Sequence, residues 1–280
     1  MPPTVSVRST GGVSLALHDL GGDGPPVLLC HPTGFHALTW APVAAELSGV
    51  ARCWALDFRG HGDSTLPGDG HVEWDGMADD VLAVVGHLGL RGLRAAGHSM
   101  GGAALVLAEQ RRPGTVAALW LFEPILFPRP EGAGPGPSGL SEGARRRRPW
   151  FPDLDAAYAN YAAKPPLDRL HPAALRAYVD HGFRDVPDGD GVELKCPPEI
   201  EAAVFEAGTR SDGFAHLSEV AAPVVVAASG DQDGPAQFAP AVAAALPHGR
   251  LERHPDLTHF GPMENPPAVA AAIRAGLGLG

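Results

Sequence analysis

A serine near the middle of the chain has the neighbours that covalent catalysis needs. Gly97-His98-Ser99-Met100-Gly101 matches the nucleophile elbow G-x-S-x-G, with a β-rich run before it and a small-residue helical run after it. Glycines flank such a serine because its backbone is strained and bulky neighbours would clash with the crossing strand and helix. The motif predicts Ser99 as a nucleophile and the Met100 N–H, at a helix N-terminus, as a donor to developing negative charge. The alternative is an ordinary Gly-Ser turn before a helix.

A histidine near the C-terminus has the position expected of a general base for this serine. Thr258-His259-Phe260-Gly261 follows a strand-like run and precedes the last predicted helix. The chain has 13 histidines, so position must choose among them. His254 is the nearest rival, but it falls in the strand or its turn. We therefore expect His259 to take the proton from Ser99, in the chain order serine, acid, histidine.

An acid is needed to orient that histidine, and two strand ends offer one. The apolar run 224–228 ends in Gly230-Asp231-Gln232-Asp233. Asp233 is predicted as the acid because it clears the strand end, whereas Asp231 is predicted to form the turn. Glu123, at the end of the preceding strand, is the alternative acid.

Short β-rich runs alternate with Ala- and Leu-rich helical runs through most of the chain. Strands are expected at residues 5–7, 15–17, 27–30, 53–56, 93–96, 117–122, 223–228 and 249–253. Helices are expected at residues 40–47, 76–88, 103–111, 238–246 and 267–277. This alternation predicts an α/β fold with a mostly parallel, doubly wound sheet of about eight strands and helices on both faces.

The region 126–217 breaks the alternation. It opens with a Gly/Pro stretch at 131–139 and a basic run at 145–148, and then has helical segments at 154–164, 172–181 and 198–207 with no strands between them. We expect a helical cap over the carboxyl edge of the sheet, where ligands bind in open α/β folds. The predicted organisation is a core of residues 1–125 and 218–280 with residues 126–217 inserted.

The aromatic residues of this insertion are candidates for the wall of an apolar substrate pocket. They are Trp150, Phe151, Tyr158, Tyr161 and Tyr178. The alternative is that they pack the small core of the insertion itself. The basic run 145–148 is most simply a solvated face or hinge, and contact with an anionic substrate is its alternative role.

Bulk properties exclude several classes of protein. The formal net charge of −11 without a basic stripe argues against nucleic-acid binding. The three cysteines are far apart, and His31 and His36 lack a third ligand nearby, so neither a disulfide framework nor a metal site is expected. The N-terminus lacks the pattern of a signal peptide, and no apolar stretch approaches the roughly 20 residues of a membrane span. A cytoplasmic protein without membrane insertion is expected; its oligomeric state does not follow from the sequence.

Four ordered motifs together resemble the α/β-hydrolase superfamily, in particular its serine esterases and lipases with a helical cap. They are the elbow 97–102, the segment 56–64 (Leu-Asp-Phe-Arg-Gly-His-Gly-Asp-Ser), the strand end 230–233 and the histidine motif 258–261. The resemblance implies ester, thioester, lactone or C–C hydrolysis without a metal or organic cofactor. It also implies that residues 57–64 form a structural turn, so Arg59 and His61 are not predicted to be catalytic.

The same resemblance assigns a second oxyanion donor to the loop after the third strand. His31-Pro32-Thr33-Gly34 occupies that place, and by position the donor is the Thr33 N–H. The superfamily usually has His-Gly where this chain has His31-Pro32, and proline removes one donor and stiffens the loop. A plain Pro-Gly turn is the alternative.

The sequence thus predicts a serine hydrolase that cleaves a small carboxylic ester through an acyl-enzyme. Hydrolysis of a thioester, lactone or C–C bond by the same residues is the second enzymatic reading. A non-catalytic homologue that binds a small molecule is the alternative from another class.

Overall fold

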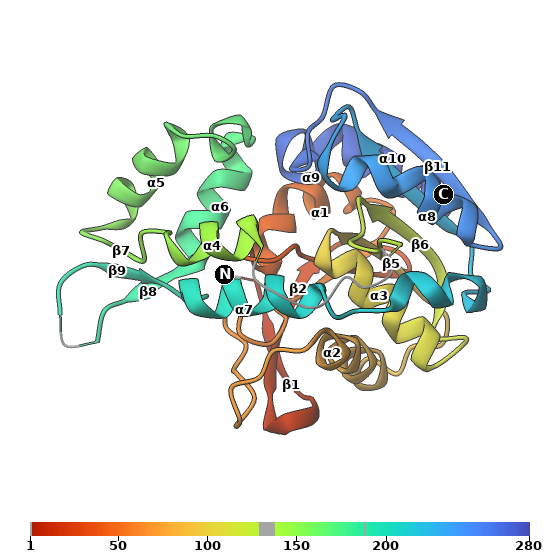
Figure 1. Ribbon diagram of the computed structural model, residues 1–280, viewed down its shortest axis with the longest axis horizontal. Helices are drawn as coiled ribbons and strands as arrows, with labels where there is room; N and C mark the ends of the chain where they lie inside the picture. Colours follow the sequence, from red (N-terminus) through yellow and green to blue (C-terminus); the bar gives the residue numbers. More distant parts are fainter. Residues whose placement is uncertain (1, 129–137, 188) are drawn as a thin grey trace.

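The computed structural model describes residues 2–128, 138–187 and 189–280. Eight strands form one sheet in the order β1-β2-β4-β3-β5-β6-β10-β11. Their bounds are β1 Thr4–Arg8, β2 Ser14–Gly21, β3 Pro26–Cys30, β4 Arg52–Leu56, β5 Leu93–His98, β6 Val116–Phe122, β10 Val224–Ser229 and β11 Gly249–His254. β2 runs antiparallel to β1 and β4, and the other pairs are parallel. The predicted α/β fold is confirmed (Figure 1).

The apolar strands separate two layers of core. In β3, Leu28 and Cys30 face one cluster of buried side chains, and Val27 and Leu29 face another, because successive side chains of a strand point to opposite faces. α2 (Trp74–His87), α3 (Met100–Arg111) and α8 (Ala239–Ala245) cover the first face. α1 (Ala41–Leu47) and α10 (Pro266–Leu277) cover the second.

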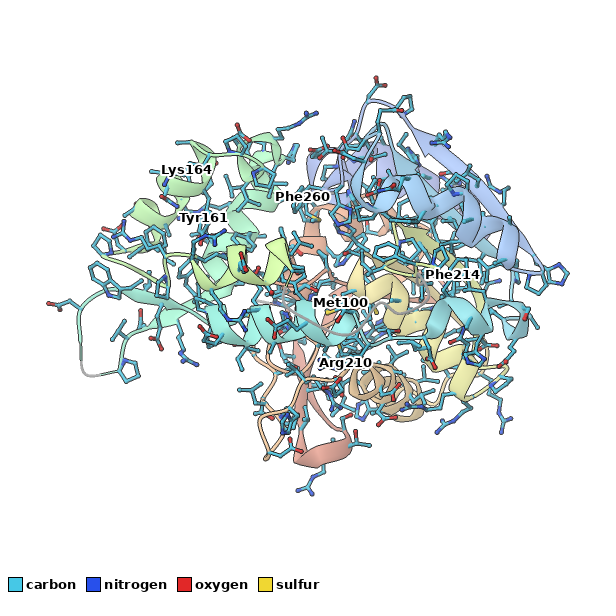
Figure 2. All side chains as sticks on the ribbon, in the orientation of Figure 1. Met100, Tyr161, Lys164, Arg210, Phe214 and Phe260 are labelled. Carbon is cyan, nitrogen blue, oxygen red and sulfur yellow. The ribbon has the colours of Figure 1, made fainter. Side chains whose placement is uncertain are left out.

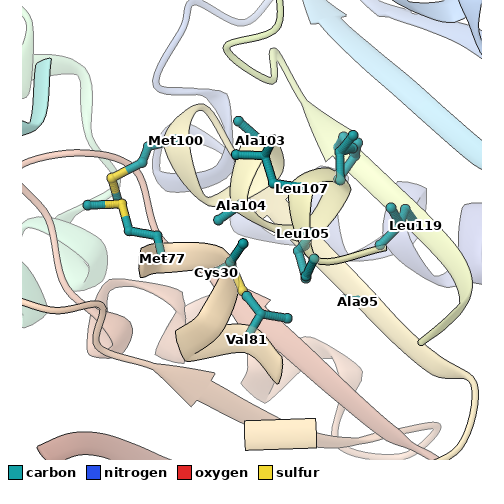
Figure 3. Packing of buried hydrophobic residues seen from close by; sticks show 14 of the residues in the cluster. Cys30, Met77, Val81, Ala95, Met100, Ala103, Ala104, Leu105, Leu107 and Leu119 are labelled. Carbon is teal, nitrogen blue, oxygen red and sulfur yellow. The ribbon is translucent and has the colours of Figure 1, made fainter. Parts of the chain in front are cut away.

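α3, the helix that begins directly after the elbow serine, is buried on all sides over most of its length. Every residue from Met100 to Glu109 is buried, which small side chains such as Ala103 and Ala104 permit. Figure 3 shows Met100, Ala104 and Leu105 of α3 near Met77 and Val81 of α2 and Cys30 of β3. A helix that is buried all round holds its N-terminal residue in a fixed position against the sheet.

The chain between β6 and β10 forms the inserted segment. Its helices are α4 Gly139–Arg145, α5 Leu154–Ala162, α6 Pro172–Gly182 and α7 Pro198–Gly208. It also has a three-stranded antiparallel sheet, β7 Trp150–Phe151, β9 Val192–Leu194 and β8 Phe183–Asp185, so the expectation of no strands here was wrong. These strands have two or three residues each, too few for an alternation of apolar and polar side chains to be visible. Most of the Gly/Pro stretch at 131–139 lies outside the described residues.

Short 3-10 helices connect the larger elements: η1 Thr10–Gly12, η2 Ala37–Trp40, η3 Leu167–Arg169, η4 Gly213–Glu219 and η5 Gly234–Phe238. A four-residue helix, α9 Gly261–Glu264, directly follows the histidine motif. Among the described residues, no helix is both long and apolar enough to cross a bilayer.

Candidate active site

Ser99 occupies the sharp turn between β5 and α3. Its backbone has φ 54° and ψ −118°, a conformation that side-chain-bearing residues rarely adopt. The turn is held by main-chain bonds: Ser99 N donates to Phe122 O at 2.9 Å, and Ala103 N donates to Ser99 O at 3.1 Å. Strain of this kind persists only where the surroundings enforce it, and it is common at functional sites.

The glycines that flank Ser99 are required by close approach of the backbone. A Cβ on Gly97 would lie 2.7 Å from the backbone of Gly102, and a Cβ on Gly101 would lie 2.4 Å from Cys30 O. Neither contact can be relieved by moving a side chain. The steric reason expected from the sequence is therefore present in the structure.

His259 is paired with a carboxylate from a different strand end than the one favoured by the sequence. Glu123, the residue after β6, accepts a hydrogen bond from His259 Nδ1 at 2.5 Å. The second oxygen of Glu123 accepts from Ser229 N at 2.7 Å. Burial alone would raise the pKa of Glu123, but the bonds from His259 and Ser229 outweigh it and lower the pKa. Glu123 is therefore ionised beside His259, which is the arrangement that fixes an imidazole tautomer.

Asp233, predicted as the acid, is exposed at the N-cap position of η5. The carboxylate of this strand end that reaches the histidine loop is Asp231, which accepts a hydrogen bond from the backbone N–H of His259 at 3.0 Å. The prediction of Asp233 as the acid therefore needs correction. The loop after β10 contacts His259 through Asp231, which binds the main chain of His259. The carboxylate that binds the His259 ring is that of Glu123.

His259 also lies beside the residue before the proposed nucleophile. The ring centroids of His98 and His259 are 4.8 Å apart at 60°, in an edge arrangement. His98 is fully buried, and burial together with the nearby His259 lowers its pKa well below the usual value. His98, a residue of the elbow itself, is therefore neutral and contacts the ring of His259, the general base predicted from the sequence.

The loop after β3 (residues 31–36, the β3 loop) leaves the amide of Thr33 unpaired within the described part of the chain. Phe35 N donates to Pro32 O at 3.2 Å, and Gly34 N donates to His61 Nε2 at 3.2 Å. Among the hydrogen bonds of the described residues, the Thr33 N–H has no acceptor, and Pro32 has no N–H to give. The Thr33 N–H is thus available as a donor, as its predicted role requires. Met100, the first residue of α3, has an N–H of the kind that a helix leaves unpaired.

The five aromatic residues proposed as a pocket wall lie mainly in the core of the inserted segment. Phe151 and Tyr178 are buried, Tyr158 and Tyr161 are half-buried against the same cluster, and Trp150 is 41% exposed. The cluster also includes Phe35 of the β3 loop, whose ring centroid lies 4.9 Å from that of Tyr178. Figure 2 shows Tyr161 within the inserted segment and Phe260, the residue after His259, at its border. Part of this core therefore packs directly on the loops that carry Thr33 and His259.

The basic run 145–148 makes contacts within the inserted segment. Arg145 pairs with Glu199 and Glu206, and Arg147 pairs with Glu201 and the hydroxyls of two tyrosines. Arg146 lies 3.9 Å from Glu142, and Arg148 stacks over Phe151 at 4.5 Å. Arg145, Arg146 and Arg148 are exposed, as expected of a solvated face, whereas Arg147 is partly buried against its partners.

One group of described residues has the composition of a cation site: His18, Asp57 and Asp63, with ligand atoms within 4.8 Å of one another. Its atoms already have protein partners. His18 Nε2 is 3.0 Å from Asp57 Oδ2, and Asp63 Oδ1 is 2.6 Å from Lys195 Nζ. The three cysteines are free and buried, and burial raises the pKa of each thiol.

The family model of the alpha/beta hydrolase family matches residues 27–272. The chain therefore belongs to the alpha/beta hydrolase family.

Individual relatives are more distant. The chain is 25% identical over 205 residues to a 2-(acetamidomethylene)succinate hydrolase of Mesorhizobium japonicum, which covers 73% of this chain and 70% of that protein. It is 38% identical over 109 residues to a bifunctional esterase/perhydrolase of Acinetobacter calcoaceticus, covering 38% and 39%. The chain thus spans less than half the length of that esterase. The crystal structure of E-2-(acetamidomethylene)succinate hydrolase superposes with a TM-score of 0.79 at 23% identity, over 99% of this chain and 100% of the other. This last likeness establishes the fold alone.

Proposed function

We propose that the protein is a serine hydrolase that cleaves a carboxylic ester through an acyl-enzyme on Ser99. The observation that carries the proposal is the 2.5 Å bond between His259 Nδ1 and Glu123, formed beside a serine with a strained backbone. An esterase among the relatives supports the choice of bond. The inserted segment acts as a cap, since it packs on Phe35 of the β3 loop and on Phe260, the residue after His259.

In the first half of the reaction, Ser99 Oγ attacks the ester carbonyl carbon while His259 Nε2 takes the hydroxyl proton. Nδ1–H of His259 donates to Glu123, which stabilises the imidazolium that forms and keeps its own charge. The N–H groups of Thr33 and Met100 bind the oxyanion. Collapse of the tetrahedral intermediate breaks the bond to the alcohol, which leaves with the proton from His259.

In the second half, a water molecule enters and gives a proton to His259 as it attacks the acyl carbon. The second tetrahedral intermediate releases the carboxylic acid, and the proton returns to Ser99. Each step needs only the groups named and water.

The test is a pair of measurements on the wild-type chain and Ser99→Ala. A fluorophosphonate probe should label the wild type at Ser99 and leave the variant unlabelled, and the wild type should turn over p-nitrophenyl acetate. Labelling without turnover of esters, thioesters or lactones would instead identify a binding protein that retains the residues. Absence of labelling would overturn the proposal.

A further inference from the structure

Two buried histidines join the β3 loop to the loop after β4 (residues 57–65, the β4 loop). His31 of the β3 loop accepts a hydrogen bond from Phe58 N at its Nε2, at 3.1 Å. His61 of the β4 loop accepts from Gly34 N at its Nε2, at 3.2 Å. The two rings lie 5.1 Å apart. Each loop thus carries an imidazole that holds an amide of the other loop.

The same contacts determine the protonation state of both rings. His31 Nδ1 lies 2.8 Å from Pro32 O, and His61 Nδ1 lies 3.1 Å from Arg59 O, so each Nδ1 carries the proton and donates it. Each Nε2 must then be an unprotonated acceptor. Burial lowers the pKa of His31 to about 3 and also lowers that of His61, so both rings remain neutral at ordinary pH.

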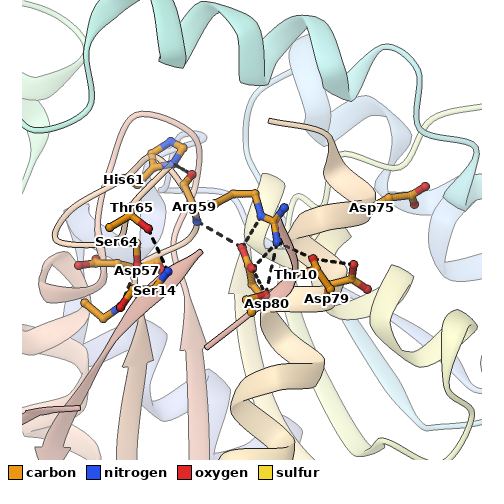
Figure 4. Close-up of polar contacts among 12 residues, drawn as sticks. Thr10, Ser14, Asp57, Arg59, His61, Ser64, Thr65, Asp75, Asp79 and Asp80 are labelled. Atoms are coloured by element: carbon orange, nitrogen blue, oxygen red, sulfur yellow. Dashed lines mark hydrogen bonds and ion pairs between the residues drawn. The ribbon is translucent and has the colours of Figure 1, made fainter. Parts of the chain in front are cut away.

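The β4 loop that presents His61 is itself rigid. Arg59 forms a buried ion pair with Asp80 of α2 at 2.6 Å (Figure 4), and Asp57 accepts from Asp63 N at 2.9 Å. Asp57 also accepts from Ala37 N at 2.7 Å, just beyond the β3 loop. His61 therefore lies on a loop that is bound to α2 and to the chain after the β3 loop, and its bond to Gly34 N restricts the movement of that amide.

Gly34 is enclosed on its other side by the inserted segment. A Cβ on Gly34 would lie 2.4 Å from Oε1 of Glu201, a residue of α7, and the glycine has φ 77°. The amide of Gly34 is thus fixed by His61 while its α-carbon is covered by Glu201. Thr33, whose N–H is free, precedes Gly34 directly. The peptide that carries this N–H is held at its carbonyl, because Pro32 O accepts from His31 Nδ1 at 2.8 Å and from Phe35 N at 3.2 Å.

From this geometry we infer that His31 and His61 are positioning residues for the Thr33 N–H, holding the β3 loop in the shape that binds the oxyanion. The inference rests on the proposed function and adds two residues that act through hydrogen bonds to the loop, without contacting substrate. A displaced donor weakens binding of the transition state more than binding of the ester, because charge on the oxygen develops only during reaction. Displacement by about 1 Å can cost on the order of 10² in rate.

The experiment compares His61→Met, which fills the space without an acceptor, with His61→Gln, whose Oε1 can accept from Gly34 N. With p-nitrophenyl acetate, His61→Met should lower kcat about 10- to 100-fold with KM changed less than about threefold. Its affinity for an alkyl boronic acid, which mimics the tetrahedral intermediate, should fall by a similar factor. His61→Gln should recover most of both losses, and His31→Met should behave like His61→Met.

The matched control is Glu109→Met. Glu109 is buried and accepts from Gly114 N and Val116 N, at the opposite edge of the sheet from Ser99. This variant should lose stability and keep kcat and boronate affinity. If His61→Met does not fold, His61→Asn replaces it, because its shorter side chain does not reach Gly34 N.

The outcomes separate the two claims. An active wild type with kcat and boronate affinity of the His61 variants no lower than those of Glu109→Met would overturn the inference alone. A wild type that hydrolyses no ester and binds no boronate would overturn the proposed function, and the positioning role with it.

Discussion

Ser99 and Glu123 follow neighbouring parallel strands, and among the described residues they are the two non-glycine residues with positive φ, 54° and 45°. Ser99 N donates to Phe122 O at 2.9 Å, so the two turns are joined by a main-chain hydrogen bond. A positive φ is unfavourable for a residue with a Cβ, so the surrounding structure must hold both residues in this conformation. Both unfavourable conformations serve one result: a hydroxyl and a carboxylate at the same edge of the sheet, with His259 reaching the carboxylate.

Replacement of the proposed nucleophile should remove catalysis and leave the fold. Ser99→Ala is expected to reduce hydrolysis of p-nitrophenyl acetate to the rate of a protein without the site, because the attacking oxygen is gone. The fold should persist because the Ser99 side chain makes no capping hydrogen bond to α3. The free energy of unfolding, measured by urea denaturation, should stay within about 0.5 kcal/mol of the wild-type value. Substantial turnover by the purified variant would mean that another residue is the nucleophile.

Replacement of the two competing acids should distinguish them clearly. Glu123→Gln should lower kcat by up to about 10⁴, since an amide favours the wrong tautomer of His259, as the comparable change does in a protease. Asp233→Asn is the matched control. It should leave kcat nearly unchanged because Asp233 is exposed. The measurement is kcat of the two variants at saturating ester. A lower kcat in Asp233→Asn than in Glu123→Gln would mean that the acid is Asp233, as the sequence predicted.

Replacement of a third carboxylate, Asp231, should lower kcat by less than replacement of Glu123 and by more than replacement of Asp233. Asp231→Asn retains an oxygen that can accept from His259 N, whereas Asp231→Ala leaves that amide without its partner. We expect Asp231→Ala to lower kcat about tenfold or more through a displaced His259, and Asp231→Asn to lower it much less. Equal kcat in the two variants would show that the bond does not position the histidine.

The sequence predicted the eight strands of the main sheet and most helices because these features are local. The proposals for Ser99, Met100 and His259 come from local patterns too. The elbow is identified by its own glycines, and its steric reason was confirmed by the approach of Gly101 to Cys30. The choice between Asp233 and Glu123 depends on where two strand ends lie relative to one histidine loop. No local pattern contains that distance.

The roles of His31 and His61 could not be predicted for a related reason. Each accepts a hydrogen bond from the loop that carries the other, about 27 residues away. A histidine that serves as a buried acceptor has the same sequence appearance as one on the surface. Only the pairing of β3 with β4 brings the two loops together.

Acidification should destabilise the fold below neutral pH. Burial lowers the pKa of four buried histidines, to about 3 for His31 and about 4 for His36, with those of His61 and His98 also lowered. The pKa of the partly buried His181 is lowered as well. Between about pH 6.5 and 4 the unfolded chain binds protons that the folded chain excludes, so the free energy of unfolding falls as pH falls. Each fully excluded proton contributes up to about 1.4 kcal/mol per pH unit.

Urea midpoints measured from pH 8 to 4.5 check this expectation. His98→Leu should reduce the slope below pH 6.5 by about one proton, because it removes one of the four groups. Glu123, whose pKa is lowered, adds to the loss in the same direction near the acid end of the range. A free energy of unfolding that is flat between pH 6.5 and 4.5 would contradict the buried, neutral state of these histidines.

The basic run 145–148 offers a last comparison, between a buried and an exposed ion pair. Arg147 is largely buried, and its partners are Glu201 and the hydroxyls of Tyr161 and Tyr178. Glu201→Gln keeps the shape but leaves the guanidinium without a counterion, which should cost up to about 3 kcal/mol in free energy of unfolding. The matched control is Glu199→Gln, which removes an exposed partner of Arg145 and should barely move the urea midpoint because water and salt screen that pair. Since Glu201 also covers Gly34, its variant should lower kcat as well as stability, whereas the control should lower neither. Equal losses in the two variants would mean that the buried pair stabilises the fold no more than the exposed pair and that Glu201 does not support the β3 loop.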